Sequence, residues 1–145
     1  MIRIATKEDV PRIVELGSLS LANGPYKDII KDTPERSATL AMQVIEGNNG
    51  KVFLFEEDGQ VHGLLGFVIY SHYFTGELTA NEIMWYVEPN YRKGGSALQL
   101  LWTAETEAKK MGAKYMGFTA PTADVAAIYA RFGYKQIEIS FGKEL

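Results

Sequence analysis

The residues with the clearest chemical potential lie in one glycine-containing stretch, residues 87–97, between an expected strand and an expected helix. Two cations are followed there by small residues: Arg92, Lys93, Gly94, Gly95, Ser96 and Ala97. Small residues leave backbone N–H groups accessible, and the first turn of a helix adds unpaired donors and a positive dipole end. The stretch therefore predicts a cradle for a diphosphate. The alternative is an ordinary glycine-rich turn with exposed cations.

Two residues outside this stretch could move protons. Glu82 lies within an apolar strand pattern, where burial would raise its pKa toward the range of a useful general base. The alternative for Glu82 is a solvent-facing position on an alternating strand. Tyr129 could act as a general acid because a phenol is still protonated near neutral pH. The alternative for Tyr129 is core packing, since it shares a helical face with Val125, Ile128 and Phe132.

The elements that would position these residues alternate between strand and helix patterns. Strand patterns cover residues 2–4, 51–57, 60–70, 81–87, 114–120 and 134–143. Helices are expected after Asp9, from Thr33 to Gly47, over residues 96–111 and over residues 122–132, while residues 17–32 read as irregular or partly helical. The resulting order, β-α-α-β-β-β-α-β-α-β, predicts one α/β domain over residues 1–145 with helices on both faces of a mixed central sheet.

The composition excludes several classes of protein. The 145 residues are 46% hydrophobic and 23% charged with a net charge of −3, which predicts a folded domain without a general nucleic-acid-binding role. Cysteine is absent and only two histidines are present, so no metal site is expected. The longest apolar run, residues 64–70, is too short to span a membrane, and the N-terminus lacks a signal-peptide pattern. A cytoplasmic protein is expected.

Several motifs resemble those of the GNAT family of N-acetyltransferases. Residues 92–97 match the signature Gln/Arg-x-x-Gly-x-Gly/Ala at each fixed position and follow a strand that ends Val-x-Pro. Residues 129–134, Tyr-Ala-Arg-Phe-Gly-Tyr, are similar to the family's Tyr-x-x-x-Gly-Phe. The order of elements resembles the GNAT fold over essentially the whole chain. Residues 82–89 also resemble the same segment of small GNAT proteins encoded by phages and prophages.

The resemblance implies an enzyme that transfers an acetyl group from acetyl-CoA to a primary amine, on a small molecule or on a protein lysine or N-terminus, without a metal. It implies that Glu82 is the general base, as in the histone-acetyltransferase branch, and that Tyr129 protonates the departing thiolate. The strand carrying Trp85, Tyr86 and Val87 would splay from its neighbour and bind the pantetheine arm through backbone groups. Residues 92–97 would hold the diphosphate.

Some positions depart from the family pattern or are weakly defined. Thr122 stands where the family often has an asparagine that contacts CoA. Only one strand is expected after Gly133, where many relatives have two, so a second subunit in a homodimer could complete the sheet. The acceptor amine is expected near Tyr26, His72, Tyr73 and Phe74. Two other functions stay open at this point: a CoA-binding regulatory module without turnover, and a nucleotide-binding domain unrelated to CoA.

Overall fold

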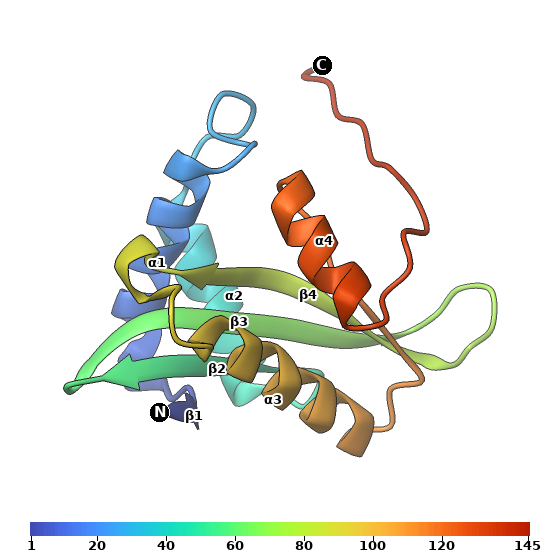
Figure 1. Cartoon of the computed structure of the whole chain (residues 1–145), viewed down its shortest axis with the longest axis horizontal. Helices are drawn as coiled ribbons and strands as arrows, with labels where there is room; N and C mark the ends of the chain where they lie inside the picture. The colour runs from blue at the N-terminus through green and yellow to red at the C-terminus, as the bar shows by residue number, and fades with distance from the viewer.

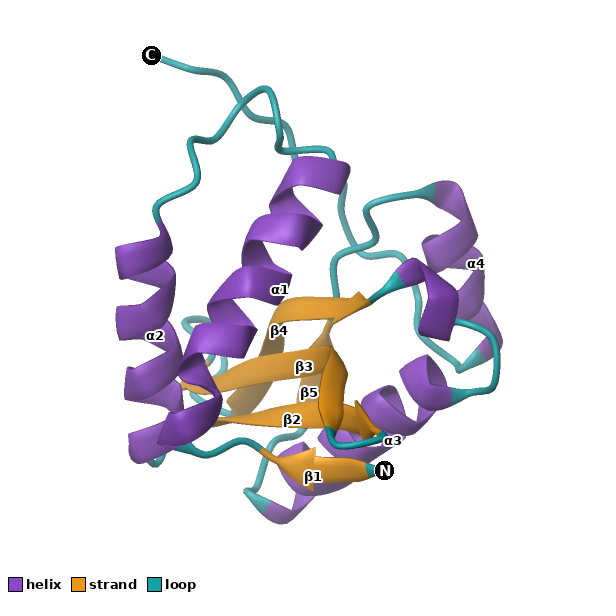
Figure 2. Cartoon of the chain, turned by 90° about the vertical axis from the view of Figure 1, so that its left-hand side faces the viewer, coloured by secondary structure: helices purple, strands orange, loops and turns teal.

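A five-stranded sheet separates two pairs of helices in the computed structural model, which describes residues 1–145 (Figures 1 and 2). The strands lie in the order β1-β2-β3-β4-β5, antiparallel except for the parallel pair β4–β5. In chain order the elements are β1 (Ile2–Ile4), the 3-10 turn η1 (Lys7–Asp9), α1 (Val10–Asn23), α2 (Pro34–Glu46), β2 (Gly50–Glu57), β3 (Gln60–Ser71), β4 (Leu78–Val87), the 3-10 turn η2 (Pro89–Tyr91), α3 (Ser96–Lys110), β5 (Tyr115–Gly117) and α4 (Ala123–Arg131). The predicted α/β class with a mixed sheet is confirmed.

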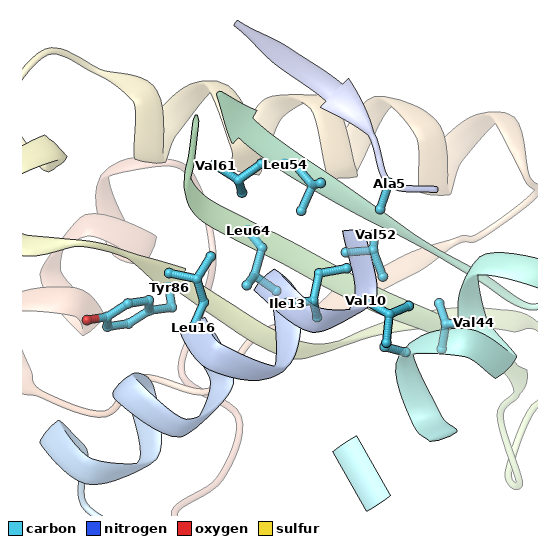
Figure 3. Close-up of a cluster of buried hydrophobic side chains, with 11 residues drawn as sticks. Ala5, Val10, Ile13, Leu16, Val44, Val52, Leu54, Val61, Leu64 and Tyr86 are labelled. Carbon is cyan, nitrogen blue, oxygen red and sulfur yellow. The ribbon is translucent and has the colours of Figure 1, made fainter. Parts of the chain in front are cut away.

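Each face of the sheet carries its own apolar core. On one face α1 and α2 cover a cluster that includes Leu16, Leu54, Leu64 and Tyr86 (Figure 3). On the other face the cluster brings α3 and α4 against strand residues such as Phe67. Successive strand residues point to opposite faces, so the apolar run of β2 and β3 reflects burial on both sides. None of the helices combines the length and apolar character that crossing a bilayer requires.

Local signals placed several boundaries correctly. Thr33 is the N-cap of α2, Pro34 occupies its first turn, and Gly47 follows its last residue. Asp58 and Gly59 form the β2–β3 turn with φ of 51° and 74°, values that Asp and Gly adopt more easily than most residues. Gly112 follows α3 with φ of 95°.

The first helix is longer than its sequence predicts. Residues 17–32 read as irregular, yet α1 continues through Gly17 to Asn23. An added Cβ at Gly17 would lie 3.7 Å from Met84 Cε, an ordinary contact distance, so α1 packs against β4 at this point and that packing outweighs the weak helix propensity of Gly17. Asp9 is the N-cap residue as expected. Its carboxylate, however, accepts hydrogen bonds from the Thr6 N–H and from Arg3 rather than from the helix.

The two strand predictions at the C-terminal end are wrong in part or in whole. The strand expected over residues 114–120 covers only Tyr115–Gly117. The strand expected over residues 134–143 is absent, and residues 134–145 carry no secondary structure. Their alternating pattern is suitable for a strand, but a strand needs a paired neighbour, and none of residues 135–145 makes a backbone hydrogen bond. The order of elements therefore ends at α4.

Candidate active site

A β-bulge in β4 determines which way Glu82 points. Gly66 of β3 pairs with Met84 and Phe67 pairs with Glu82, so Ile83 is an extra residue between two paired positions. Strict alternation would place Glu82 on the face of Met84, which packs with α1 and α2. The bulge reverses this, and Glu82 shares the opposite face with Trp85, beneath α4. The sequence gives no sign of this bulge.

The strand β4 extends past the end of β5, so one of its edges has no strand partner there. The parallel pairing of β4 with β5 covers only Thr79–Tyr115, Ala80–Met116 and Asn81–Gly117. From Glu82 to Val87 the edge of β4 on that side has no strand partner, although β3 pairs with its other side as far as Val87. Unpaired backbone donors and acceptors at such an edge can bind an extended ligand as an added strand would. The expected opening of the sheet is therefore present between β4 and β5.

Glu82 and Tyr129 both form hydrogen bonds with the backbone of Thr119, which follows the last paired residue of β5. The Thr119 N–H donates to Glu82 Oε2 at 3.4 Å, and the Tyr129 hydroxyl donates to the Thr119 carbonyl at 3.4 Å. Both distances exceed the usual range of about 2.7–3.2 Å, so neither group is held by a strong hydrogen bond. The sequence did not indicate Thr119, because its contribution comes from its main chain.

Burial changes the acidity of both side chains. Desolvation raises the pKa of Glu82 above its ordinary value, against the opposing effect of the Thr119 N–H. Desolvation also raises the pKa of Tyr129 well above its ordinary value, and the charge of Glu82 adds to this rise. The Glu82 carboxylate is thus a stronger base than a solvated one, and Tyr129 is protonated throughout the physiological range.

Aromatic side chains surround Tyr129. The Tyr129 ring, only 6% exposed, has its centroid 5.6 Å from that of Trp85, 5.1 Å from that of Phe118 and 5.9 Å from that of Tyr134. The Trp85 Nε1–H is buried without a hydrogen-bond partner. The surroundings of Tyr129 are therefore largely apolar, which explains its desolvation.

The loop between β4 and α3 has the geometry of an anion cradle. Gly94 and Gly95 have φ of 121° and 86°, and an added Cβ on either would meet no atom within 4 Å. Gly95 is the N-cap of α3, so no side chain caps the first-turn N–H groups of this helix. Its first intrahelical bond runs from the Gln99 N–H to the Gly95 carbonyl at 2.9 Å. The earlier N–H groups have no intrahelical partner and can bind an anion.

The side chains of the loop divide into those that hold it and those that are free. Arg92 Nε donates to the Val87 carbonyl at 2.8 Å, and its guanidinium lies 5.7 Å from the centre of the buried Tyr86 ring. Ser96 Oγ donates to the Tyr91 carbonyl at 2.9 Å and is buried. Lys93 is exposed and makes no ion pair. The remaining predicted member, Ala97, packs against the α3–α4 core. Ser96 therefore shapes the loop, while backbone N–H groups and Lys93 are available to a ligand.

Behind the loop lies a polar network that was not predicted from the sequence. Glu88 accepts from Arg12 Nη2 at 2.9 Å and lies 2.7 Å from His62 Nδ1, which donates to it. The His62 ring stacks on Tyr91, with centroids 3.7 Å apart and planes at 11°. Partial burial alone would raise the pKa of Glu88. The hydrogen bonds from His62 and Arg12 outweigh this effect, and the pKa of Glu88 is lowered. The sequence did contain one indication of this network, the polar His62 within the apolar run of β3, because a buried polar side chain needs a hydrogen-bond partner.

Replacing Glu88 by glutamine should weaken its interactions with Arg12 and His62 and thereby destabilise the fold. Because its pKa is lowered in the folded state, ionised Glu88 stabilises the fold above its ordinary pKa, and this contribution disappears as the pH falls. We expect a Tm lower by about 2–4 °C near neutral pH, corresponding to roughly 1 kcal/mol, with the difference shrinking in acid. Thermal melts across pH measure this. The exposed Glu46 on α2 gives a matched control, and equal losses at all pH values in Glu88→Gln would contradict the explanation.

Other predicted site residues lie elsewhere. Thr122 is the N-cap of α4 and its Oγ1 accepts from the Val125 N–H at 3.3 Å, so it serves the helix. Tyr26 is half-exposed in the α1–α2 connection. His72, Tyr73 and Phe74 form the tip of the β3–β4 hairpin, at the opposite end of β4 from the loop before α3 (Figure 1). They stack on one another and not on the site. Because β4 begins three residues earlier than predicted, the tip of the hairpin lies farther from the site than expected.

A hollow of about 550 Å³ adjoins the loop on the α1 side of β4. Its volume falls within the range of small-molecule sites, about 300–1,000 Å³. The side chains that line it come from α1, β4 and the loop: Leu19, Asn23, Tyr86, Glu88, Pro89, Asn90, Tyr91 and Arg92. The Arg12–Glu88 pair also joins α1 to this loop, so the network behind the loop maintains one wall of the hollow.

The sequence of residues 19–134 matches the acetyltransferase (GNAT) family. The chain belongs to this family. The match spans the opening beside β4, the loop before α3 and the helix that carries Tyr129, so all three features lie within the shared GNAT domain. No curated protein matches the sequence significantly.

Solved GNAT structures share the fold at low sequence identity. A predicted acetyltransferase from Clostridium acetobutylicum with acetyl-CoA has a TM-score of 0.83 at 16% identity, covering 99% of this chain and 95% of that one. An aminoglycoside acetyltransferase from an uncultured soil metagenomic sample, in complex with sisomicin, has a TM-score of 0.76 at 19% identity over 100% and 95%. Glucosamine-6-phosphate N-acetyltransferase from Arabidopsis thaliana has a TM-score of 0.77 at 16% identity over 99% and 97%. These likenesses establish the fold.

Proposed function

We propose that this GNAT protein is an enzyme that transfers the acetyl group of acetyl-CoA to a primary amine by direct attack on the thioester. The observation that carries the proposal is that Glu82 and Tyr129 bind the N–H and the carbonyl of the same residue, Thr119, just beyond the point where β5 stops pairing with β4. A buried carboxylate and a buried phenol at such an opening supply a proton acceptor and a proton donor in one place.

The reaction needs both. An alkyl ammonium with a pKa of about 10.4 is almost fully protonated near neutral pH, and reaching the free amine costs about 4–5 kcal/mol. Glu82 accepts the proton that the amine loses as the C–N bond forms. Tyr129 supplies a proton to the sulfur as the C–S bond breaks and the thiolate leaves with the bonding electrons. Solvent then restores the proton of Tyr129 and removes the one on Glu82.

The coupling between the two groups favours this order of events. The negative charge of Glu82 is one cause of the raised pKa of Tyr129. When Glu82 has taken the amine proton, that charge is gone and the pKa of Tyr129 falls. Tyr129 therefore becomes a better acid at the stage when the thiolate needs a proton, and it is held protonated before that stage.

The chain's own residues fit acetyl-CoA. The open space at Gly94 and Gly95, together with the uncapped N–H groups of α3, suits a diphosphate. The edge of β4 from Glu82 to Val87 has no strand partner, although Arg92 occupies the Val87 carbonyl, and its other backbone groups suit the amide groups of a pantetheine arm. This edge leads from the diphosphate cradle to Glu82, so a cosubstrate that spans it would present its thioester to the proposed base.

The acceptor is proposed to be an amino sugar, a class suggested by the aminoglycoside and glucosamine-6-phosphate enzymes among the structural neighbours. The test is CoA thiol release from acetyl-CoA with sisomicin, with glucosamine 6-phosphate and with a lysine peptide, each product being identified by mass spectrometry. Acetylated amine together with thiol release supports the proposal. Binding of acetyl-CoA without thiol release from any amine would instead favour a CoA-binding regulatory module.

Replacing Tyr129 by phenylalanine removes the proposed acid without removing the ring. We expect kcat to fall by about 100-fold, while the Kd for acetyl-CoA changes little because the ring contacts with Trp85 and Phe118 are retained. Steady-state thiol release and calorimetric titration measure the two quantities. Tyr115→Phe is a matched control, since Tyr115 is 60% exposed on β5. An unchanged kcat in Tyr129→Phe would mean that the thiolate leaves without this proton.

A further inference from the structure

The turn η2 is held in place by two other elements, α1 and β3. Arg12 of α1 donates through Nη2 to one Glu88 carboxylate oxygen at 2.9 Å and through Nε to the Val61 carbonyl at 2.9 Å. His62 of β3 donates through Nδ1 to the other Glu88 oxygen at 2.7 Å, and the His62 carbonyl accepts from the Glu88 N–H at 2.9 Å. Each oxygen of the Glu88 carboxylate therefore has a donor of its own, and the residue that precedes η2 is bound through its side chain and its backbone.

Tyr91, the last residue of η2, is held by ring contacts. Its ring stacks on that of His62, with centroids 3.7 Å apart and planes at 11°, and meets the Phe55 ring edge-on at 6.4 Å. His62 and Phe55 are both buried, so Tyr91 packs on two side chains that belong to the interior of the fold. The turn is thus fixed at its start through Glu88 and at its end through Tyr91.

The position of the turn is passed on to the start of α3. The Tyr91 carbonyl accepts from Ser96 Oγ at 2.9 Å, and Ser96 is the first residue of α3. Between these two residues the N–H groups of residues 93–95 make no backbone hydrogen bond, and an added Cβ at Gly94 or Gly95 would meet no atom within 4 Å. Glycine backbone is intrinsically free to adopt many conformations. The shape of the loop therefore depends on its two ends, and one of these ends is the turn that Glu88 and Tyr91 fix.

An anion site made of backbone N–H groups binds tightly only while those groups point to one place. If a loop adopts that arrangement for only a tenth of the time, the apparent Kd of its ligand rises 10-fold. Side chains that never touch a ligand can therefore determine its affinity when they hold the groups that do.

We propose that Arg12, His62 and Glu88 are positioning residues for the diphosphate of the cosubstrate. They hold η2 and, through the bond between Tyr91 and Ser96, they keep the N–H groups of the loop in the arrangement that binds the anion. The proposal rests on the function proposed above, because it concerns the same cosubstrate.

The positioning role separates binding from chemistry. Glu82 and Tyr129 form their hydrogen bonds with Thr119 and not with this network. Weakening the network should therefore weaken cosubstrate binding while the chemical step in the saturated enzyme keeps its rate.

Two substitutions weaken the network from its two sides. Arg12→Gln removes the ion pair from α1, and His62→Phe removes the donor of β3 while it keeps a ring against Tyr91. We expect each to raise the Kd for CoA by about 10-fold in calorimetric titration. The KM for acetyl-CoA should rise by a similar factor, with kcat unchanged at saturation.

Arg3→Gln is the matched control for Arg12→Gln. Arg12 pairs with the two carboxylates of Glu15 and Glu88. Arg3 likewise pairs with two carboxylates, those of Asp9 and Glu56, and neither belongs to the turn or the loop. The control should lose stability as Arg12→Gln does and bind CoA as the wild type does. An equal rise of the Kd in both variants would attribute the effect to general loss of stability and overturn the proposal.

A shorter cosubstrate separates support of the diphosphate site from damage elsewhere. S-Acetylpantetheine carries the thioester and the amide arm but no diphosphate, so its kcat/KM should be the same in the wild type, Arg12→Gln and His62→Phe. An unchanged Kd for CoA in either variant, or an equal loss with acetylpantetheine, overturns the positioning role.

The titration with CoA also distinguishes the positioning role from the proposed function. A wild type that binds CoA without transferring an acetyl group to any amine would refute the proposed enzyme, and the ratio of Kd values between variant and wild type would still decide the positioning role. A wild type without affinity for CoA would overturn both.

Discussion

Replacing Glu82 by glutamine is expected to lower kcat for acetyl transfer by about 100- to 10,000-fold without weakening acetyl-CoA binding. Glutamine has the same shape, and its carbonyl oxygen can still accept from the Thr119 N–H. It cannot accept the amine proton. Thiol release gives kcat, and titration with CoA gives the Kd. Glu57→Gln is the matched control, since Glu57 also lies on a strand but is exposed.

The pH dependence of the wild type should report the same group. Burial raises the pKa of Glu82 above its ordinary value, so kcat/KM should rise with pH through an acidic limb that lies higher than a solvated glutamate would give. The Glu82→Gln variant should lack this limb and retain only the rise caused by deprotonation of the substrate ammonium. If both proteins show the same acidic limb, the limb is caused by the titration of a group other than Glu82.

The same substitution should stabilise the fold. A carboxyl group with a raised pKa favours the folded state below its unfolded pKa, and this advantage is lost as the pH rises through the folded value. Near neutral pH the buried charge therefore destabilises the protein, and glutamine removes it. We expect a higher Tm for Glu82→Gln at neutral pH and a smaller difference in acid. A lower Tm would indicate that Glu82 is a structural residue.

The order of elements could be predicted because local residues determine most of its boundaries. Thr33 with Pro34 begins α2, Asp58 with Gly59 turns the β2–β3 hairpin, and Gly112 ends α3 through its own backbone. The open backbone of the loop before α3 could be predicted for the same reason, since its glycines and small residues are consecutive in the chain. A feature that depends on one short stretch of backbone is visible in the sequence.

The details that orient the proposed catalytic pair depend on contacts between distant segments. The bulge at Ile83 is defined by pairing with β3, and the opening at Glu82 exists because β5 stops at Gly117. Neither follows from the period of β4 alone. Core packing and catalysis were alternatives for Tyr129 in the sequence, yet its ring is buried while its hydroxyl reaches Thr119. Helical periodicity predicts on which face a tyrosine ring packs, but it does not predict what the hydroxyl group contacts.

Replacing Gly95 by glutamate is expected to abolish acetyl-CoA binding. Gly95 has φ of 86°, and an added Cβ would meet no protein atom within 4 Å, so the new side chain enters the space assigned to the diphosphate. Its negative charge would also lie against the N-terminus of α3, where it would take the place of the anion. We expect the Kd for CoA to rise at least about 100-fold. The measurement is calorimetric titration, together with loss of the CoA-dependent rise in Tm.

The control for this prediction must separate backbone strain from occupancy of the cradle. Gly59 provides it, because it has a similar φ of 74°, is equally free of neighbours and lies in the β2–β3 turn. Both glutamate variants carry the cost of a positive φ, so their Tm values without ligand should fall by similar amounts. Only Gly95→Glu should lose CoA binding. If both variants bind CoA as the wild type does, the loop is a simple turn, and the diphosphate must bind at another place on the protein.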